Sequence, residues 1–379
     1  MTKRSAIVHV GLEKTGSTAI QRWLEINSQE LIAEGVLIPR SLGFPNHTKL
    51  VSACLDDGIV DHIKAYHLFA SGHSEARFRE SVFSALDREI ASAGMTWHSL
   101  VITSELISSR LSSETEIHRL FDRIAGYVDD IHILIFLRRQ DQLALSRFSS
   151  ILRSGHSEFN RLFVDYSPRN FRSLPIDRTV SDDVFFYDFD AILSRFARVP
   201  GAKLHVHAYG RTSPLDALMR LLALEPSSQG HVRERHNTAL SAEAQFVLAC
   251  LNAQHPVQFP SGMRNEGFRR LQRRIEHEVK GAPRTIGRDE ARQFLLRYHQ
   301  INQRVADQYA GGQALFSDDF DRYPTTVDYS HFPDVLNPVV QHYQSLAGAL
   351  PSHEPLRQHW TYRLRRIKAS TVDLLRGRG

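Results

Sequence analysis

This sequence of 379 residues contains little that points to a membrane or to disulfide chemistry. Its longest apolar run, residues 131–137, is interrupted by His132 and is far shorter than the roughly 20 apolar residues that a spanning helix needs. The apolar stretch within residues 1–10 is too short for a signal peptide. Its two cysteines, Cys54 and Cys250, have no CxxC or CxxxH context, which argues against a disulfide framework or a zinc site. We therefore expect a cytoplasmic protein.

The composition is that of a globular chain. Hydrophobic residues make up 42% and charged residues 23%, values that exclude a disordered or collagen-like protein. The formal charge is +5, and the basic excess is C-terminal: eleven Lys and Arg stand against five Asp and Glu in residues 262–304, and seven against one from residue 356 onward. Such an excess suits nucleic acid, an anionic membrane or a polyanionic small molecule.

Apolar, β-branched runs alternate with segments of helical periodicity. Buried strands are predicted at residues 6–10, 99–103, 131–137, 184–187 and 203–207. Helices are predicted at residues 17–32, 114–128, 140–153, 189–196, 214–224, 241–252, 268–279 and 288–309. This alternation indicates a three-layer α/β fold, in which helices cover both faces of a central parallel sheet, followed by a mainly helical C-terminal part. Ligands of such sheets bind at the carboxyl ends of the strands.

The segment His9-Val-Gly-Leu-Glu-Lys14-Thr-Gly-Ser-Thr18 connects the first predicted strand to the first predicted helix. Backbone N–H groups and the positive end of a helix converge on an anion at such a junction, and Lys14 adds a full charge. The order differs from a Walker A loop, GxxxxGK[ST], because Lys14 precedes Gly16. The segment predicts a phosphate-binding loop of another type; a turn without function is the alternative.

A second motif follows the strand predicted at residues 131–137. Arg138 ends that strand, and Ser146 follows eight residues later, two helical turns along the next helix. An arginine and a serine at this spacing lie on one side of the chain and can bind one phosphate together, the arginine as a bidentate donor. Arg139 is the alternative to Arg138, unless it is a solvated residue at the start of the helix.

Both motifs resemble those of sulfotransferases that use 3′-phosphoadenosine 5′-phosphosulfate (PAPS). The family's 5′-phosphosulfate loop has the common form Pro-Lys-(Ser/Thr)-Gly-(Ser/Thr)-(Ser/Thr), and its Arg(x7)Ser pair binds the 3′-phosphate; here Glu13 replaces the proline. Further segments similar to bacterial members are Gly35-Val-Leu-Ile-Pro39, Asn46-His47, Thr103-Ser-Glu105, Asn237-Thr-Ala-Leu-Ser241, Asn302-Gln-Arg-Val-Ala306 and Leu315-Phe316. The resemblance covers residues 5–325 and implies a P-loop NTPase-like sulfotransferase fold.

The resemblance implies an enzyme that moves a sulfuryl group from PAPS to a hydroxyl of a carbohydrate, glycolipid or related small molecule. The product of the donor would be adenosine 3′,5′-bisphosphate, no metal is required, and Lys14 would stabilise the leaving oxygen. The expected donor-binding residues are Lys14, Thr15, Gly16, Ser17 and Thr18 on the loop, together with Arg138 and Ser146.

A hydroxyl acceptor needs a general base, for which the sequence offers Glu105 and His47. Glu105 follows the strand predicted at residues 99–103, and relatives with glycan acceptors use a glutamate; other relatives use a histidine. We favour Glu105. Its alternatives are a helix N-cap or an ion pair with Lys14, and the alternative for His47 is a surface helix cap.

The expected division of the chain is a PAPS-binding core at residues 1–225, a helical part at 226–325 that completes the core and the acceptor site, and a basic extension at 326–379. A Pro/Ser-rich stretch at residues 226–230 would link the first two. The basic tail with interspersed apolar residues at 360–368 could lie on the inner face of an anionic membrane, or be disordered, or pack as a helix.

Two other functions compete with sulfuryl transfer. A P-loop-type kinase or related phosphotransferase needs a GK[ST] loop and a magnesium carboxylate, and neither is apparent in the sequence. A non-enzymatic nucleic-acid-binding protein would suit the basic helices, yet aromatic platforms and a recognisable module are lacking. We therefore expect a small-molecule or glycan acceptor and no nucleic-acid partner.

Overall fold

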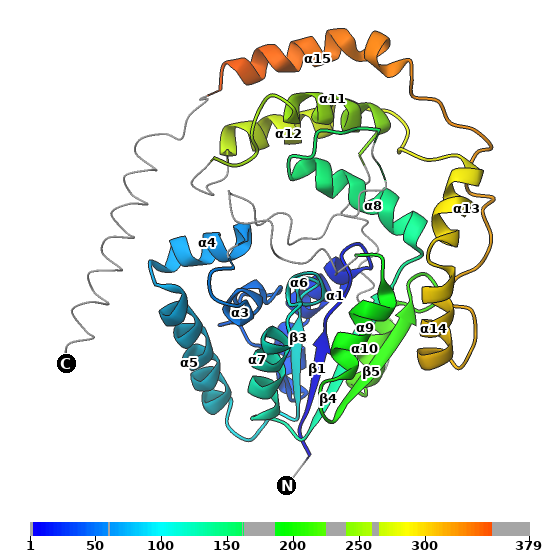
Figure 1. Cartoon of the computed structure of the whole chain (residues 1–379). Helices are drawn as coiled ribbons and strands as arrows, with labels where there is room; N and C mark the ends of the chain where they lie inside the picture. Colours follow the sequence, from blue (N-terminus) through cyan, green and yellow to red (C-terminus); the bar gives the residue numbers. More distant parts are fainter. Residues whose placement is uncertain are drawn as a thin grey trace.

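The protein has an α/β fold built on a parallel sheet (Figure 1). The computed structural model describes residues 3–59, 61–160, 162, 186–224, 240–259 and 265–350. Within these residues the sheet has five strands in the order β2-β3-β1-β4-β5, and all neighbouring strands pair in parallel. The strands are β1 (Ser5–His9), β2 (Val36–Leu37), β3 (Ser99–Thr103), β4 (Asp130–Leu137) and β5 (Ala202–Ala208). The α/β class and the parallel sheet expected from the sequence are confirmed.

Helices connect the strands and then form the C-terminal part of the described chain. They are α1 (Ser17–Ile26), α2 (Ser28–Ala33), α3 (Thr48–Cys54), α4 (His62–Ser71), α5 (Glu75–Ala93), α6 (Leu106–Arg110), α7 (Glu114–Ala125), α8 (Gln140–Arg153), α9 (Phe189–Ala197), α10 (Pro214–Leu221), α11 (Ala242–Asn252), α12 (Glu266–Glu278), α13 (Arg288–Leu296), α14 (His299–Tyr309) and α15 (Phe332–Gly348). Within the described residues, no helix combines the length and the apolar character needed to cross a membrane.

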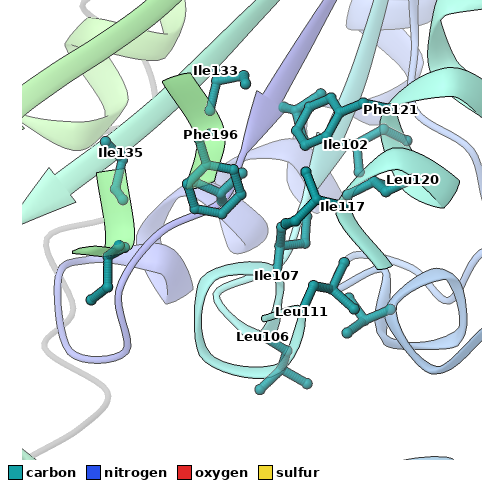
Figure 2. Packing of buried hydrophobic residues seen from close by; sticks show 14 of the residues in the cluster. Ile102, Leu106, Ile107, Leu111, Ile117, Leu120, Phe121, Ile133, Ile135 and Phe196 are labelled. Atoms are coloured by element: carbon teal, nitrogen blue, oxygen red, sulfur yellow. The ribbon is translucent and has the colours of Figure 1, made fainter. Parts of the chain in front are cut away.

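Side chains of β1, β3 and β4 alternate between the two faces of the sheet, and both faces are buried there. The edge strand β5 is only partly buried. One face, which includes Ile7 and Leu134, packs against α1, α2 and α10. The other face packs against helices that include α3, α5, α7 and α9. Figure 2 shows this second face, where Ile133 of β4 lies near Phe121 of α7 and Phe196 of α9. Burial on both faces explains why β1, β3 and β4 are almost uniformly apolar.

The order of the strands places a topological switch point between β1 and β4, at the carboxyl edge of the sheet. The connection from β1 leads to β2 on one side of the sheet, whereas the connection from β4 leads to β5 on the other. Since β1 and β4 are neighbours, their following segments separate at this point, which is where ligands of open parallel sheets bind. The segments that leave the two strands here are residues 10–16 and 138–139.

Two long helices of the sequence prediction are each two helices in the structure. The segment 17–32 is divided at Asn27, whose backbone N–H and side-chain amide both donate to the carbonyl oxygen of Trp23. The segment 288–309 is divided at residues 297–298, between α13 and α14. In both cases the helical spacing of apolar residues continues across a local break, so periodicity alone does not reveal it.

The strand predicted at residues 184–187 is wrong for the part that is described, because Phe186 and Tyr187 lie in a turn before α9. Their aromatic rings are buried in the core, and their backbone does not pair with a strand of the sheet. Residues 184–185, the linker expected at 226–230 and the resemblance segment at 237–239 lie outside the described residues.

Of the C-terminal helices, α11, α12 and α15 lie beyond the carboxyl ends of the strands, with α8 between them and the sheet, whereas α14 lies beside the sheet and packs on α9 (Figure 1). Apolar residues of α8, α11, α13 and α15 share one cluster, and α11, α12 and α15 share another. The first part of the segment expected as a basic extension is therefore α15, packed on α11 and α12; the hydroxyl of Tyr343 donates to Glu278 at 2.6 Å. Residues 351–379, including the candidate membrane contact at 360–368, lie outside the described residues.

The packing of α6 on the core leads to a prediction about stability. Ile107 is fully buried between α6 and the sheet (Figure 2), so Ile107→Ala should lower the free energy of unfolding by about 2–5 kcal/mol. Ile26, which is 60% exposed on α1, is the matched control; its replacement by Ala should change stability by less than about 0.5 kcal/mol. Urea unfolding followed by circular dichroism measures both, and equal effects would contradict this account of the packing.

Candidate functional site

The segment between β1 and α1 is a tight loop with an unusual backbone at its lysine. Lys14 has φ 69°, in the left-handed region that costs a residue with a side chain about 1–2 kcal/mol. Gly11 and Gly16 have φ 43° and 93°. A non-glycine residue held in this conformation indicates that the surrounding structure imposes it, as happens at ligand-binding loops.

The start of α1 is open toward the carboxyl edge of the sheet. Gly16 occupies the N-cap position, and no side chain caps the helix there. A Cβ at Gly16 would lie 2.9 Å from Pro214 Cγ and 3.2 Å from Tyr209 Cε2, so glycine is required by the close approach of α10 as well as by φ. The first amides of a helix have no intrahelical acceptor and can receive an anion.

The three hydroxyl-bearing residues of the loop, Thr15, Ser17 and Thr18, differ in their surroundings. Thr15 is fully buried, and its hydroxyl donates to the carbonyl oxygen of Leu12, which stabilises the loop from within. Ser17 is 6% exposed, and its Oγ has no hydrogen-bond partner within the described part of the chain. Thr18 is exposed. Ser17 and Thr18 are thus better placed than Thr15 to use their hydroxyls on a ligand.

The structure brings the two sequence motifs into contact. Arg138 follows β4, and its Nη1 donates to the carbonyl oxygen of Lys14 at 3.1 Å. The guanidinium carbon lies 5.4 Å from the ring centroid of Tyr209. Ser146 is partly exposed on α8, the helix that begins two residues after Arg138.

The neighbouring Arg139 has a structural role. It is 3% exposed and makes a bidentate pair with Asp141, with both nitrogen–oxygen distances 2.9 Å. Its Nη1 donates to the carbonyl oxygens of Ser317 and Asp319 at 2.7 and 2.6 Å. These bonds tie the start of α8 to the segment after α14, so Arg138 is the better candidate for a phosphate ligand.

Glu105 follows β3 at the same edge of the sheet. Its Oε2 accepts a hydrogen bond from Gln21 Nε2 at 2.8 Å, and both carboxylate oxygens are within 3.3 Å of Asn46 Nδ2. It stands at the N-cap position of α6 but makes no side-chain cap bond there. Ile107 and Leu111 anchor α6 in the core (Figure 2), which fixes the position of the carboxylate.

His47 lies inside the protein, not on its surface. It is fully buried; its Nε2 bonds the carbonyl oxygen of Pro39 at 2.9 Å, and its Nδ1 accepts from the backbone N–H of Thr103 at 2.9 Å. Burial lowers the pKa of His47 from 6.5 to about 4. Because the backbone occupies both ring nitrogens, this histidine links residues 39–47 to the end of β3 and has no nitrogen left for an acceptor hydroxyl.

The ammonium of Lys14 is surrounded by charges of both signs. Burial lowers the pKa of Lys14, and the positive charges of Arg153 and Arg138 lower it further. The negative charges of Glu13 and Glu105 raise it. Lys14 is thus a partly desolvated cation at the carboxyl edge of the sheet, where its charge acts more strongly than in water.

Several residues at this site were not predicted from the sequence. Gln21 lies one helical turn after Ser17, and this i, i+4 spacing on α1 could have identified it. Tyr209 follows β5, and its position after a strand is a weaker signal. Arg110 and Arg147, which flank Glu13, carry no spacing signal at all, because only the tertiary packing of α6 and α8 brings them to the loop.

Comparisons with protein-family models, with curated proteins and with solved structures find no match to this chain. Among the residues that the structure describes, no group of three or more His, Cys, Asp and Glu side chains is arranged to hold a metal ion.

The buried histidine gives a prediction about pH. In the folded state the pKa of His47 is about 4, below its value of 6.5 in the unfolded chain, so between these values the unfolded state binds more protons and stability falls as the pH falls. Replacing His47 with Gln should remove about 1.4 kcal/mol per pH unit from the slope of unfolding free energy against pH in this window. Chemical denaturation at pH 4 to 7 measures the slope, and an unchanged slope would contradict the burial of a neutral imidazole.

Proposed function

We propose that the chain is a PAPS-dependent sulfotransferase with the P-loop-like fold of that family. The observation that carries the proposal is the hydrogen bond from Arg138 to the carbonyl oxygen of Lys14. It joins the loop after β1 to the arginine after β4, on neighbouring strands at the edge where ligands of parallel sheets bind. One nucleotide with phosphates on both sides of its ribose would need two such anion sites close together.

The donor would bind through two groups of residues. The amides at the start of α1, the hydroxyls of Ser17 and Thr18 and the ammonium of Lys14 suit the 5′-phosphosulfate. Arg138 with Ser146 suits the 3′-phosphate, because the guanidinium is a bidentate donor and the serine is partly exposed on the following helix.

The chemistry would be an in-line displacement at sulfur. The acceptor oxygen forms a bond to sulfur, the bond from sulfur to the bridging oxygen breaks, and adenosine 3′,5′-bisphosphate leaves. Lys14 would balance the charge that develops on the leaving oxygen. Glu105, held by Gln21 and Asn46, would take the proton of the acceptor hydroxyl.

The proposed acceptor is a hydroxyl of a carbohydrate, glycolipid or related small molecule. The support for this class is a partly exposed carboxylate, Glu105, which follows β3 and contacts the partly exposed Gln21 and Asn46. The proposed location is the cytoplasm. The acceptor can be identified by transferring labelled sulfate from PAPS into an extract of the host cell and analysing the labelled product.

Binding of the nucleotide product tests the proposal without knowledge of the acceptor. Calorimetry should detect one adenosine 3′,5′-bisphosphate per chain, and ATP or an oligonucleotide should bind far more weakly. Arg138→Met should weaken binding about 10- to 100-fold, the range expected when a charge-assisted hydrogen bond is lost. Arg22→Met, at an exposed position on α1, is the matched control and should bind like the wild type. Tight binding of ATP in place of the bisphosphate would favour a kinase.

Transfer of labelled sulfate tests the base. Glu105→Gln keeps the shape of the side chain but removes proton acceptance, so turnover should fall about 10²- to 10⁴-fold while affinity for adenosine 3′,5′-bisphosphate is retained. Near-full turnover by this variant would show that another group takes the proton.

A further inference from the structure

Glu13, the residue before the loop lysine, lies between two buried arginines. Its Oε1 is 3.9 Å from Arg110 Nη1, and its Oε2 is 3.9 Å from Arg147 Nε. The side chains of these arginines are 7% and 3% exposed, and that of Glu13 is 22% exposed. At these distances the contacts are ion pairs and not hydrogen bonds, and their strength comes from the low dielectric around them.

Arg110 is itself held firmly from its other side. It is the last residue of α6, and its Nε donates to Asp61 Oδ2 at 2.8 Å. Asp61 is 2% exposed, and its Oδ1 accepts from the first backbone amides of α4. The ion pair with Glu13 therefore connects the loop to a rigid network and not to a mobile side chain.

Arg147 holds the loop from the opposite direction. It lies on α8, and its guanidinium carbon is 3.5 Å from the ring centroid of Phe186. Because α6 follows β3 and α8 follows β4, Glu13 joins the loop to the two helices whose first turns adjoin Glu105 and Arg138. The two ion pairs of Glu13 thus connect the three parts of the proposed active site.

Glu13 remains ionised in this environment. Burial alone would raise the pKa of its carboxyl, but the charges of Arg147, Arg110 and Lys14 and a hydrogen bond with Ser109 more than reverse that effect and hold the pKa below its usual value. The carboxylate also provides a counter-charge for these clustered cations, which would repel one another without it.

We propose that Glu13 is a positioning residue that fixes the left-handed backbone at Lys14 by pairing with Arg110 and Arg147, and so does by ion pairing what a proline at this position would do by rigidity. This inference rests on the proposed donor site. On charge alone a carboxylate at position 13 is unexpected, because a negative charge next to an anion-binding loop disfavours the binding of anions.

The two effects of Glu13 predict opposite results, which makes the inference testable. If its charge merely repels the donor, Glu13→Gln should strengthen the binding of adenosine 3′,5′-bisphosphate. If it positions the loop, the same variant should weaken binding about 10- to 100-fold, the range expected when a charge-assisted hydrogen bond to the phosphate is lost. Glu25→Gln removes the same charge from an exposed position on α1 and should bind like the wild type.

A pH series separates positioning from general loosening of the fold. Glu13 raises the pKa of Lys14, so the loss of affinity at alkaline pH should occur at lower pH in Glu13→Gln than in the wild type. Glu13→Asp keeps the charge on a shorter side chain; it should bind more weakly with an unshifted alkaline limb. This second variant carries the test if Glu13→Gln does not fold, as judged by its thermal unfolding.

The possible results separate a failure of the role of Glu13 from a failure of the proposed sulfotransferase function. Weaker binding by both Glu13 variants, with wild-type binding by Glu25→Gln, supports the inference. Binding by Glu13→Gln as tight as that of the wild type, or tighter, overturns it while the proposed function stands. Failure of the wild-type protein to bind adenosine 3′,5′-bisphosphate would instead overturn the proposed function.

Discussion

The hydrogen bond from the Arg138 guanidinium to the carbonyl oxygen of Lys14 is the contact on which the site depends. It exists because β1 and β4 are parallel neighbours in register from Ser5↔Asp130 to His9↔Leu134, so their carboxyl ends open side by side. The strand order 2-3-1-4-5 then directs the following segments to opposite sides, which is the arrangement at which ligands of open parallel sheets bind. A different register or order would separate the lysine loop from the arginine.

Ionic and polar contacts reinforce this arrangement from both flanks. Asp141 holds Arg139 away from the loop, so that of these two neighbours Arg138 contacts it. Gln21 and Asn46 hold Glu105. Each of these residues lies in a helix or next to one, and apolar packing anchors these helices, as Figure 2 shows for α6. The site is therefore built of polar side chains on rigid supports, which is what positioning of two phosphates and one acceptor demands.

The sequence predicts those parts of the fold whose signal is local. The strands β1, β3 and β4 are predictable because parallel strands buried on both faces are almost uniformly apolar. The partly buried edge strand β5 instead alternates apolar residues with Lys203, His205 and His207. The two-residue β2 is too short to give such a signal, and α5 is absent from the prediction although Phe78, Val82, Leu86 and Ile90 recur on one face of it. In the site, the loop and Arg138 are visible as sequence motifs. The bonds that occupy both nitrogens of His47, and the ion pairs of Glu13, come from tertiary packing and have no counterpart in the spacing of residues.

The most direct test of the account is a crystal structure of the protein with adenosine 3′,5′-bisphosphate bound. The account predicts one nucleotide at the carboxyl edge of the sheet, with its 5′-phosphate on the amides of residues 15–18 and on Lys14, and its 3′-phosphate on Arg138 and Ser146. A nucleotide bound elsewhere, or one that touches the loop while its 3′-phosphate lies away from Arg138, would contradict it.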